Sequence, residues 1–340
     1  MAKPRIPSQK KNYAKLNQRL AGYVEQIKAI YDDLNKRASS MALSVGFSEG
    51  EFMFSNYPEL KDRLFNLQKQ FVNDIGTNIY SNTSKEWKNS NLVQDLLARK
   101  VLSFYTAIAH GKEYEKYFET NSDALKAFQK RKDNGMNLSA KLWNQAENYK
   151  VGLETAISTA IQKGTSAITL SKRVSQYLND FPSLQADYTD KFGHAAKAKD
   201  CQYASIRLAR SEINMAYRTA EQTRWRQFDF ILGYEIKLSK KHPAPDICDD
   251  LVGKYPKDFV WTGWHPNDMC YAIPIIASED EYWSDKPLQY VDNVPDGLKD
   301  WVLNNQPRIA QAEKRGTLPY FLRDNMDVVR KIIKEDKAVL

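Results

Sequence analysis

The chain has 340 residues, 42% of them hydrophobic and 27% charged, and a formal net charge of +8 at pH 7. This composition is typical of a soluble protein with two or more folded units, and the charge permits contact with nucleic acid or an acidic partner without requiring it. Three cysteines exclude a disulfide framework and favour a reducing compartment. The amino terminus lacks the apolar core of a signal peptide, and no apolar run is long enough to span a bilayer. The protein is therefore expected in the cytosol or in a structure assembled there, without a membrane contact.

The amino-terminal half carries three stripes of apolar residues at helical spacing. They run over residues 13–34, 60–79 and 92–108, with steps that are mostly three and four residues. Such stripes predict amphipathic helices longer than the globular average. They could pair with a partner in a coiled coil, but no strict heptad is sustained, so the core of a helical bundle is the favoured interpretation.

Two more helices are expected before residue 180. Ser139 is a candidate N-cap for a helix that ends at Gly164, and a shorter helix covers 170–178. Between Asp180 and Lys199 the periodicity lapses, and the proline, glycine and lysine residues there predict a solvated loop.

The remaining third mixes helix and strand. A long helix is expected over 203–230 with Gly233 as its stop, followed by short strands at 234–238 and 270–276. Polar helices continue from Glu279 to the end. The expected fold class is mainly α with a small α+β carboxyl-terminal unit, in which a long helix and short strands surround a cysteine and histidine loop. The expected regions are a helical region 1–135, a mixed domain 136–278 and a helical extension 279–340.

Two of the three cysteines and two of the four histidines lie within one stretch of this mixed domain. Two thiols and two imidazoles suffice for a closed tetrahedral zinc site. The four candidate ligands are His242, Cys248, His265 and Cys270, with Asp246 and Asp268 as alternates or supports. Their spacing lies outside the tightest zinc-finger patterns. A second interpretation therefore stays open, in which the cysteines are small buried residues and His265 is a hydrogen-bonded core histidine.

Charged side chains suggest two further kinds of contact. Two groups of basic residues could contact DNA phosphates or an acidic partner, or could simply be exposed to solvent. They are Lys130, Arg131 and Lys132, and Lys191, Lys197 and Lys199. Arg210 and Glu212 lie early in the long helix. An ion pair that ties this helix to the small sheet is favoured over a catalytic acid, and Arg218 could pair with the strands in the same way.

Five ordered segments together resemble the Mu-F-like family of phage minor head proteins, also called head morphogenesis proteins. They are Leu208–Arg218, Gly233–Ser239, His242–Gly253, Trp264–Pro266 and Cys270–Pro274. The family combines an Arg-Thr-Glu helix, a strand, a segment ending in Leu-x-Gly and a His-Pro-x-Cys-x-Cys motif. The resemblance covers about 141–276. It departs at Asp268, which stands where relatives have the first cysteine of the last motif, and this weakens the inference of a thiolate-rich site.

The resemblance implies a structural protein of the virion rather than an enzyme. Its expected place is the procapsid interior or the portal vertex, where it would serve head assembly and DNA packaging after synthesis in the host cytoplasm. The implied partners are the portal protein, capsid or scaffold proteins and, non-specifically, DNA. Two enzymatic alternatives stay open: a metal-dependent nuclease that uses His242, Asp246 and His265, and an ADP-ribosyltransferase-like effector suggested by Glu279 and Glu281.

Overall fold

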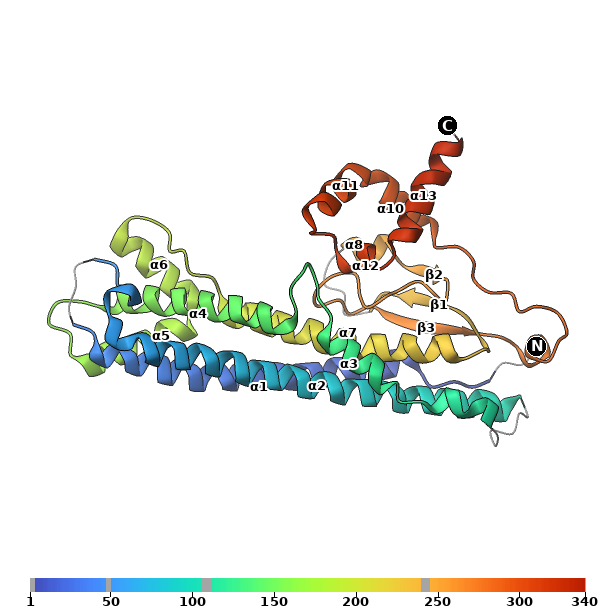
Figure 1. The fold of residues 1–340 in the computed structure, drawn as a ribbon, viewed down its shortest axis with the longest axis horizontal. Helices are drawn as coiled ribbons and strands as arrows, with labels where there is room; N and C mark the ends of the chain where they lie inside the picture. The colour runs from blue at the N-terminus through green and yellow to red at the C-terminus, as the bar shows by residue number, and fades with distance from the viewer. Residues whose placement is uncertain (1–3, 47–49, 106–111, 240–244, 340) are drawn as a thin grey trace. The chain divides into compact units, whose positions relative to one another are not determined.

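The computed structural model describes residues 4–46, 50–105, 112–239 and 245–339. The fold is mainly α-helical with a small antiparallel sheet in the carboxyl-terminal region, as the sequence predicts (Figure 1). Among the described helices, none combines the length and the apolar character needed to cross a membrane.

The chain forms two compact units. The sheet unit comprises Met1–Ala21, Asn82–Gly135 and Arg210–Leu340, and the helical unit comprises Gly22–Ser81 and Met136–Ala209. Three long helices contribute to both units: α1 (Gln9–Met41), α2 (Lys61–Phe104) and α7 (Cys201–Gln227). The units are therefore not consecutive along the chain, whereas the sequence suggests three consecutive regions.

Within its described residues the helical unit adds three α-helices, α4 (Leu138–Ala160), α5 (Ala167–Asn179) and α6 (Phe181–Phe192), which pack against one another (Figure 1). It also holds the short 3-10 helices η1 (Ala42–Ser44), η2 (Phe54–Asn56) and η3 (Pro58–Leu60). The apolar stripes of the sequence supply its core. The ring of Tyr31 meets Phe71 edge-on at 5.7 Å and Tyr149 at 6.0 Å. The stripes expected over 60–79 and 92–108 share the single helix α2 as far as Phe104.

The prediction of a loop between Asp180 and Lys199 is wrong, because most of this segment forms helix α6. The Asp180 carboxylate caps the helix by accepting from the Ser183 backbone N–H at 3.1 Å, and Pro182 occupies the first turn. Gly193 ends the helix in the left-handed conformation at φ 75°, which glycine adopts without steric cost. Proline is a helix breaker only in the interior, and in a first turn it favours the helix.

The limits of α4 also differ from the expected ones. Its N-cap is Asn137, whose side chain accepts from the Ala140 N–H at 2.9 Å, and Ser139 lies inside the helix. The helix ends at Ala160 rather than at Gly164. Lys191 from α6 donates its ammonium group to the carbonyl oxygens of Ser158 at 2.6 Å and Ile161 at 2.5 Å. A cation at the carboxyl end of a helix satisfies free carbonyl groups and opposes the helix dipole.

Replacing Lys191 with methionine should lower the unfolding free energy by about 1–2 kcal/mol, because these carbonyl groups lose a charged donor. Burial already lowers the pKa of Lys191, so the ammonium group depends on these acceptors. Lys197→Met is the matched control at an exposed lysine nearby, with an expected change within about 0.5 kcal/mol. Urea unfolding followed by circular dichroism measures both. Equal stability of the two variants would contradict the capping role.

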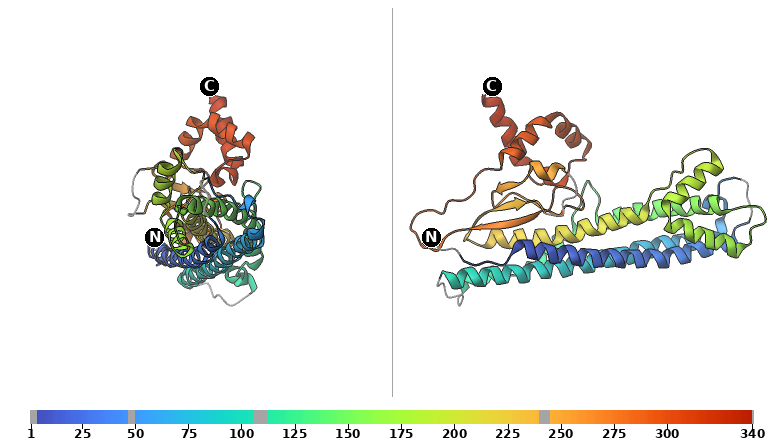
Figure 2. Two further views of the ribbon diagram at one scale, coloured as in Figure 1. Left: turned by 90° about the vertical axis from the view of Figure 1, so that its left-hand side faces the viewer. Right: turned by 180° about the vertical axis from the view of Figure 1, so that it is seen from behind.

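The sheet unit is built on three antiparallel strands in the order β2-β1-β3. The strands are β1 (Ile231–Lys237), β2 (Gly253–Tyr255) and β3 (Tyr271–Ile276). The carboxyl-terminal part of α7 covers one face, and the last helices of the chain lie on the other side (Figures 1 and 2). The other helices of this unit are η4 (Lys112–Phe118), α3 (Ser122–Lys130), α8 (Ile247–Asp250), α9 (Glu279–Tyr282), α10 (Asp296–Asn304), α11 (Gln306–Arg315), α12 (Tyr320–Arg323) and α13 (Met326–Val339).

Gly233 does not end α7, which stops at Gln227. It lies inside β1, where the pairing with β3 shifts register. A Cβ atom at this position would lie 2.7 Å from the backbone oxygen of Tyr255 in β2, so the close approach of two strands requires glycine here. The strand β2 has only three residues and was not expected from the sequence.

A buried carboxyl group joins the first turns of α1 to α7 within the sheet unit. The Tyr13 hydroxyl donates to Glu221 at 2.6 Å, and the Gln94 amide donates to its other oxygen at 3.4 Å. Burial is the largest effect on this group and raises the pKa of Glu221 to about 8, against the opposing influence of these donors and of Arg218. The native protein therefore holds this proton at neutral pH.

The stability of the sheet unit should fall as pH rises from about 4.5 to about 8. In this window the unfolded chain releases the Glu221 proton while the native state retains it, so the unfolded state is favoured by up to about 1.4 kcal/mol per pH unit. Glu221→Gln should flatten this decline, because an amide does not titrate. Chemical unfolding at several pH values measures the slope, with Glu313→Gln on the exposed surface as control. Parallel slopes for wild type and Glu221→Gln would contradict the assignment.

Candidate metal centre

The short helix α8 holds Cys248 in place at its first turn. The Asp246 carboxylate accepts from the Cys248 backbone N–H at 2.7 Å, and the Asp249 carboxylate accepts from the Asp246 N–H at 2.8 Å. This reciprocal pattern is a capping box, and the side chains that make it are local in sequence. It fixes the backbone that carries the thiol.

Cys248 is shared by two groups of potential metal ligands. Asp246, Cys248 and His265 form one group, and Cys248, Asp268 and Cys270 form the other, with the ligand atoms of each group within 4.8 Å of one another. The His265 Nε2 atom lies 3.2 Å from both Cys248 Sγ and Asp246 Oδ2. Nitrogen and sulfur ligands of a tetrahedral zinc ion are separated by about 3.5 Å, so the first group is close to the spacing that zinc requires.

The second nitrogen of His265 supports this arrangement. Nδ1 lies 2.8 Å from the carbonyl oxygen of Pro266, so a proton on Nδ1 makes a hydrogen bond and leaves the Nε2 lone pair directed at the cluster. Metal-binding histidines are commonly oriented in this way by a backbone carbonyl group.

The two thiols of the cluster are inaccessible to solvent. Cys248 is 0% exposed and Cys270 is 1% exposed. A hydrogen bond with Cys270, burial and the nearby Asp268 carboxylate all raise the pKa of the Cys248 thiol. Without a cation the Cys248 thiol is therefore protonated and unreactive, whereas a bound divalent metal ion would favour its thiolate.

Asp268 is held by Arg218 of α7 in a fully buried ion pair. Its Oδ2 atom lies 3.1 Å from the guanidinium group, and both side chains are 1% exposed. The Asp268 carboxylate also accepts from the backbone N–H groups of Trp264 at 2.8 Å and Cys270 at 2.6 Å. Burial by itself would raise the pKa of Asp268, but Arg218 and these two donors outweigh it and lower the pKa.

Arg218 also binds the loop backbone directly. It donates to the carbonyl oxygens of Thr262, Asp268 and Cys270 at 3.1, 3.1 and 2.8 Å. Gly263 makes this approach possible, since a Cβ atom there would collide with the guanidinium group, and its φ of 125° disfavours any other residue. One arginine thus fixes the backbone on both sides of His265.

The structure brings together most of the ligands expected from the sequence. Cys248 lies with His265 and Asp246 in one group and with Cys270 and Asp268 in the other, whereas His242 lies outside the described residues. Asp268 is near enough to serve as a ligand, but Arg218 and two backbone N–H groups already engage its oxygens. Thiolate, imidazole and carboxylate ligands fit a zinc ion.

Among the other expected site residues, some make contacts within their own unit and others are exposed. Glu212 pairs with Arg131 at 2.8 Å, and the Arg131 guanidinium lies 3.7 Å from the centroid of the Phe128 ring. Arg131 therefore stabilises the sheet unit internally, and Lys191 caps α4 as described above. The remaining basic candidates are exposed: Lys130, Lys132, Lys197 and Lys199.

The Glu279 and Glu281 pair has a structural explanation. The Glu281 carboxylate accepts from the Ser278 backbone N–H at 2.7 Å, and the Ser278 hydroxyl accepts in return from the Glu281 N–H at 3.2 Å. This is the capping box of α9, so Glu281 serves to begin a helix.

Comparisons with known proteins leave the family open. No protein-family model matches the chain, and no curated protein or solved structure is significantly similar to it.

Proposed function

We propose that this protein is a minor head protein of a tailed phage, a structural component that docks at the portal vertex and serves head assembly and DNA packaging. One observation carries the proposal. Two of the sequence segments that resemble the Mu-F-like family, Leu208–Arg218 and Cys270–Pro274, are joined through Arg218, whose four hydrogen bonds tie α7 to the loop before β3. These residues of the resemblance tie a helix to a loop, and such a role supports the proposal of a structural protein.

The proposal includes a structural zinc ion held by Asp246, Cys248 and His265, whose ligand atoms lie within 4.8 Å of one another, with Cys270 or His242 as the fourth ligand. Buried thiols and an oriented imidazole favour a closed site over a catalytic one, since a catalytic zinc ion keeps a position open for water. The ion would stabilise a loop that is rich in proline, glycine and polar residues.

The assembly role is tested by isolating procapsids and mature particles from cells that produce the phage. We expect this chain in one or both at low copy number, and we expect it to co-purify with the portal protein. Quantitative mass spectrometry of purified particles measures the copy number of this chain and its co-purification with the portal protein. Absence of the chain from procapsids and mature particles alike would contradict the proposal.

The nuclease alternative is favoured by the 3.2 Å approach of Asp246 to His265, which are both partly accessible. A metal-dependent nuclease would convert supercoiled plasmid to nicked or linear forms, and His265→Ala would abolish this activity. Under the structural proposal the purified protein leaves plasmid DNA intact with zinc or magnesium present. Cleavage that depends on His265 would replace the structural proposal with the enzymatic one.

A further inference from the structure

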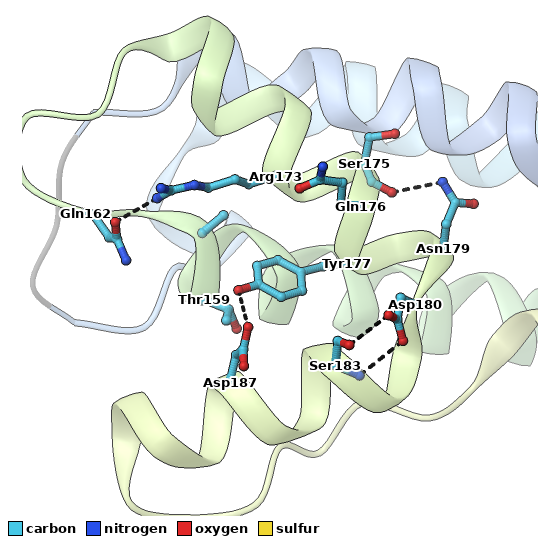
Figure 3. Close-up of a pocket in the computed structure, with 11 residues that line it drawn as sticks. Thr159, Gln162, Arg173, Ser175, Gln176, Tyr177, Asn179, Asp180, Ser183 and Asp187 are labelled. Carbon is cyan, nitrogen blue, oxygen red and sulfur yellow. Dashed lines mark hydrogen bonds between the residues drawn. The ribbon is translucent and has the colours of Figure 1, made fainter.

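Two hollows of the described surface differ in how their polar groups are engaged. The larger, in the helical unit, has a volume of about 740 Å³ and lies among α4, α5 and α6 (Figure 3). Several of its polar side chains bind one another. Arg173 donates to Gln162 at 2.7 Å, the Tyr177 hydroxyl donates to Asp187 at 2.7 Å, and Asp180 caps α6. These groups stabilise the helix junction and are not available for a ligand.

The second hollow belongs to the sheet unit and has a volume of about 550 Å³. The first three turns of α1 form one wall. Arg210 of α7 and the residues beside Cys270, namely Met269 and Tyr271, form others. It is thus next to the candidate metal centre but contains none of its ligands.

Four polar side chains of this second hollow, from Lys10, Asn17, Gln18 and Arg210, have donor groups without a partner among the described residues. The Arg210 Nε atom is buried and has no hydrogen-bond partner. No hydrogen bond or ion pair of the described residues involves the side chains of Lys10, Asn17 or Gln18, which also line the hollow. An unpaired buried donor costs about 1–3 kcal/mol, so an acceptor supplied from outside would be strongly favoured.

The positive charge of this hollow indicates which kind of hydrogen-bond acceptor could bind there. Among the described residues that line it, Lys10 and Arg210 are the charged ones, and none carries a carboxylate. Lys10 lies in the first turn of α1, which has no acidic residue, so the positive end of the helix dipole adds to the same field. The first 21 residues of the chain contain six lysine and arginine residues and no aspartate or glutamate. The occupant is therefore anionic.

The apolar part of the lining decides between classes of anion. Tyr271 and Met269 are partly exposed, and with arginine they are the residue types enriched in protein interfaces. A single nucleic-acid strand needs a track of cations along its phosphates, whereas only two of the described side chains that line this hollow are charged. A small metabolite needs enclosure, whereas Lys10, Ala14 and Gln18 are exposed at the wall formed by α1.

We propose that this hollow binds an acidic segment of a protein partner. A carboxylate of the partner pairs with Arg210 and Lys10, and a neighbouring apolar side chain packs against Met269 and Tyr271. The amide groups of Asn17 and Gln18 bind the backbone of the segment. The inference concerns a site separate from the metal cluster and does not depend on the role in head assembly.

The test uses a random dodecapeptide library displayed on phage and selected against the purified full-length protein. Selected peptides should share an aspartate or glutamate beside an aromatic or aliphatic residue. One of them, labelled with fluorescein, then gives a Kd by fluorescence anisotropy. Ala14→Glu introduces a negative charge at an exposed position of the hollow, and Arg210→Gln removes the central cation. Each should weaken binding by at least about tenfold.

Lys11→Gln is the matched control, because it removes a charge from the same helix turn outside the hollow. Its Kd should stay within about twofold of the wild-type value. Circular dichroism confirms that each variant is folded. Selected peptides without a shared carboxylate, or equal weakening by Ala14→Glu and Lys11→Gln, would overturn the proposal. A twelve-residue oligothymidylate that binds wild type and not Ala14→Glu would also overturn it in favour of a nucleic-acid surface.

Discussion

Replacing Arg218 with methionine should lower the unfolding free energy of the sheet unit by about 3–5 kcal/mol, because it leaves the Asp268 carboxylate buried without its counterion. Methionine fills most of the volume of arginine, so the loss reflects charge and hydrogen bonding rather than a cavity. Three carbonyl oxygens of the loop lose their donor at the same time. A change of this size exceeds the typical effect of a point substitution.

The matched control is Arg330→Met, which breaks an exposed pair with Glu313 and should cost less than about 1 kcal/mol. Urea unfolding measured by tryptophan fluorescence compares the two variants. A double-mutant cycle with Asp268→Asn isolates the contribution of the ion pair. A loss below about 1 kcal/mol for Arg218→Met, equal to that of the control, would show that the pair does not hold the loop.

Acid should act on the same pair in a definite direction. The pKa of Asp268 is lowered in the folded state, so its contribution to stability is complete above the unfolded value of 3.8 and is lost as pH falls through the folded value. Wild type should therefore lose more stability below pH 3.8 than Asp268→Asn does. The comparison needs only unfolding curves at a few acidic pH values.

The helices that were predicted correctly follow from local patterns of apolar residues in the sequence. The stripes over 13–34 and 60–79 predicted α1 and α2 because the burial of a helix face repeats every three or four residues. The helix α6 was missed because Pro182 and Gly193 were interpreted as loop residues, whereas they begin and end a helix. The strand β2 is too short to carry a pattern.

The sequence predicted which residues form the candidate site but not the ion pair that holds them in place. The clustering of Cys248, His265 and Cys270 in sequence indicated a shared location, and in the structure Cys248 lies near His265 in one ligand group and near Cys270 in the other. The sequence suggested that Arg218 pairs with the strands, but not that its partner is Asp268, fifty positions away. Asp268 was expected as an alternate or supporting metal ligand, in the place where relatives have a cysteine, since no local pattern reveals a buried ion pair between distant segments.

Cys248→Ala should abolish metal binding and lower the stability of the sheet unit, because Cys248 is the ligand that both groups share. At a zinc concentration one hundred times Kd, binding to the native state alone contributes about 2.7 kcal/mol. Wild type should therefore contain about one equivalent of zinc when it is purified without chelator or affinity metal. Chelation of that zinc should lower its midpoint of unfolding, whereas Cys248→Ala should not respond to the chelator.

Cys201→Ala provides the matched control for this prediction. Cys201 is a buried free cysteine like Cys248, but it lies in the helical unit and outside both ligand groups. Both substitutions remove a buried sulfur atom and carry a similar packing cost, so only the loss of a ligand separates them. Cobalt-substituted protein should show thiolate-to-metal charge-transfer absorption in wild type and in Cys201→Ala, and none in Cys248→Ala.

Less than about a tenth of an equivalent of zinc in wild type would reject the metal centre. The loop would then depend on Arg218 and Asp268 alone.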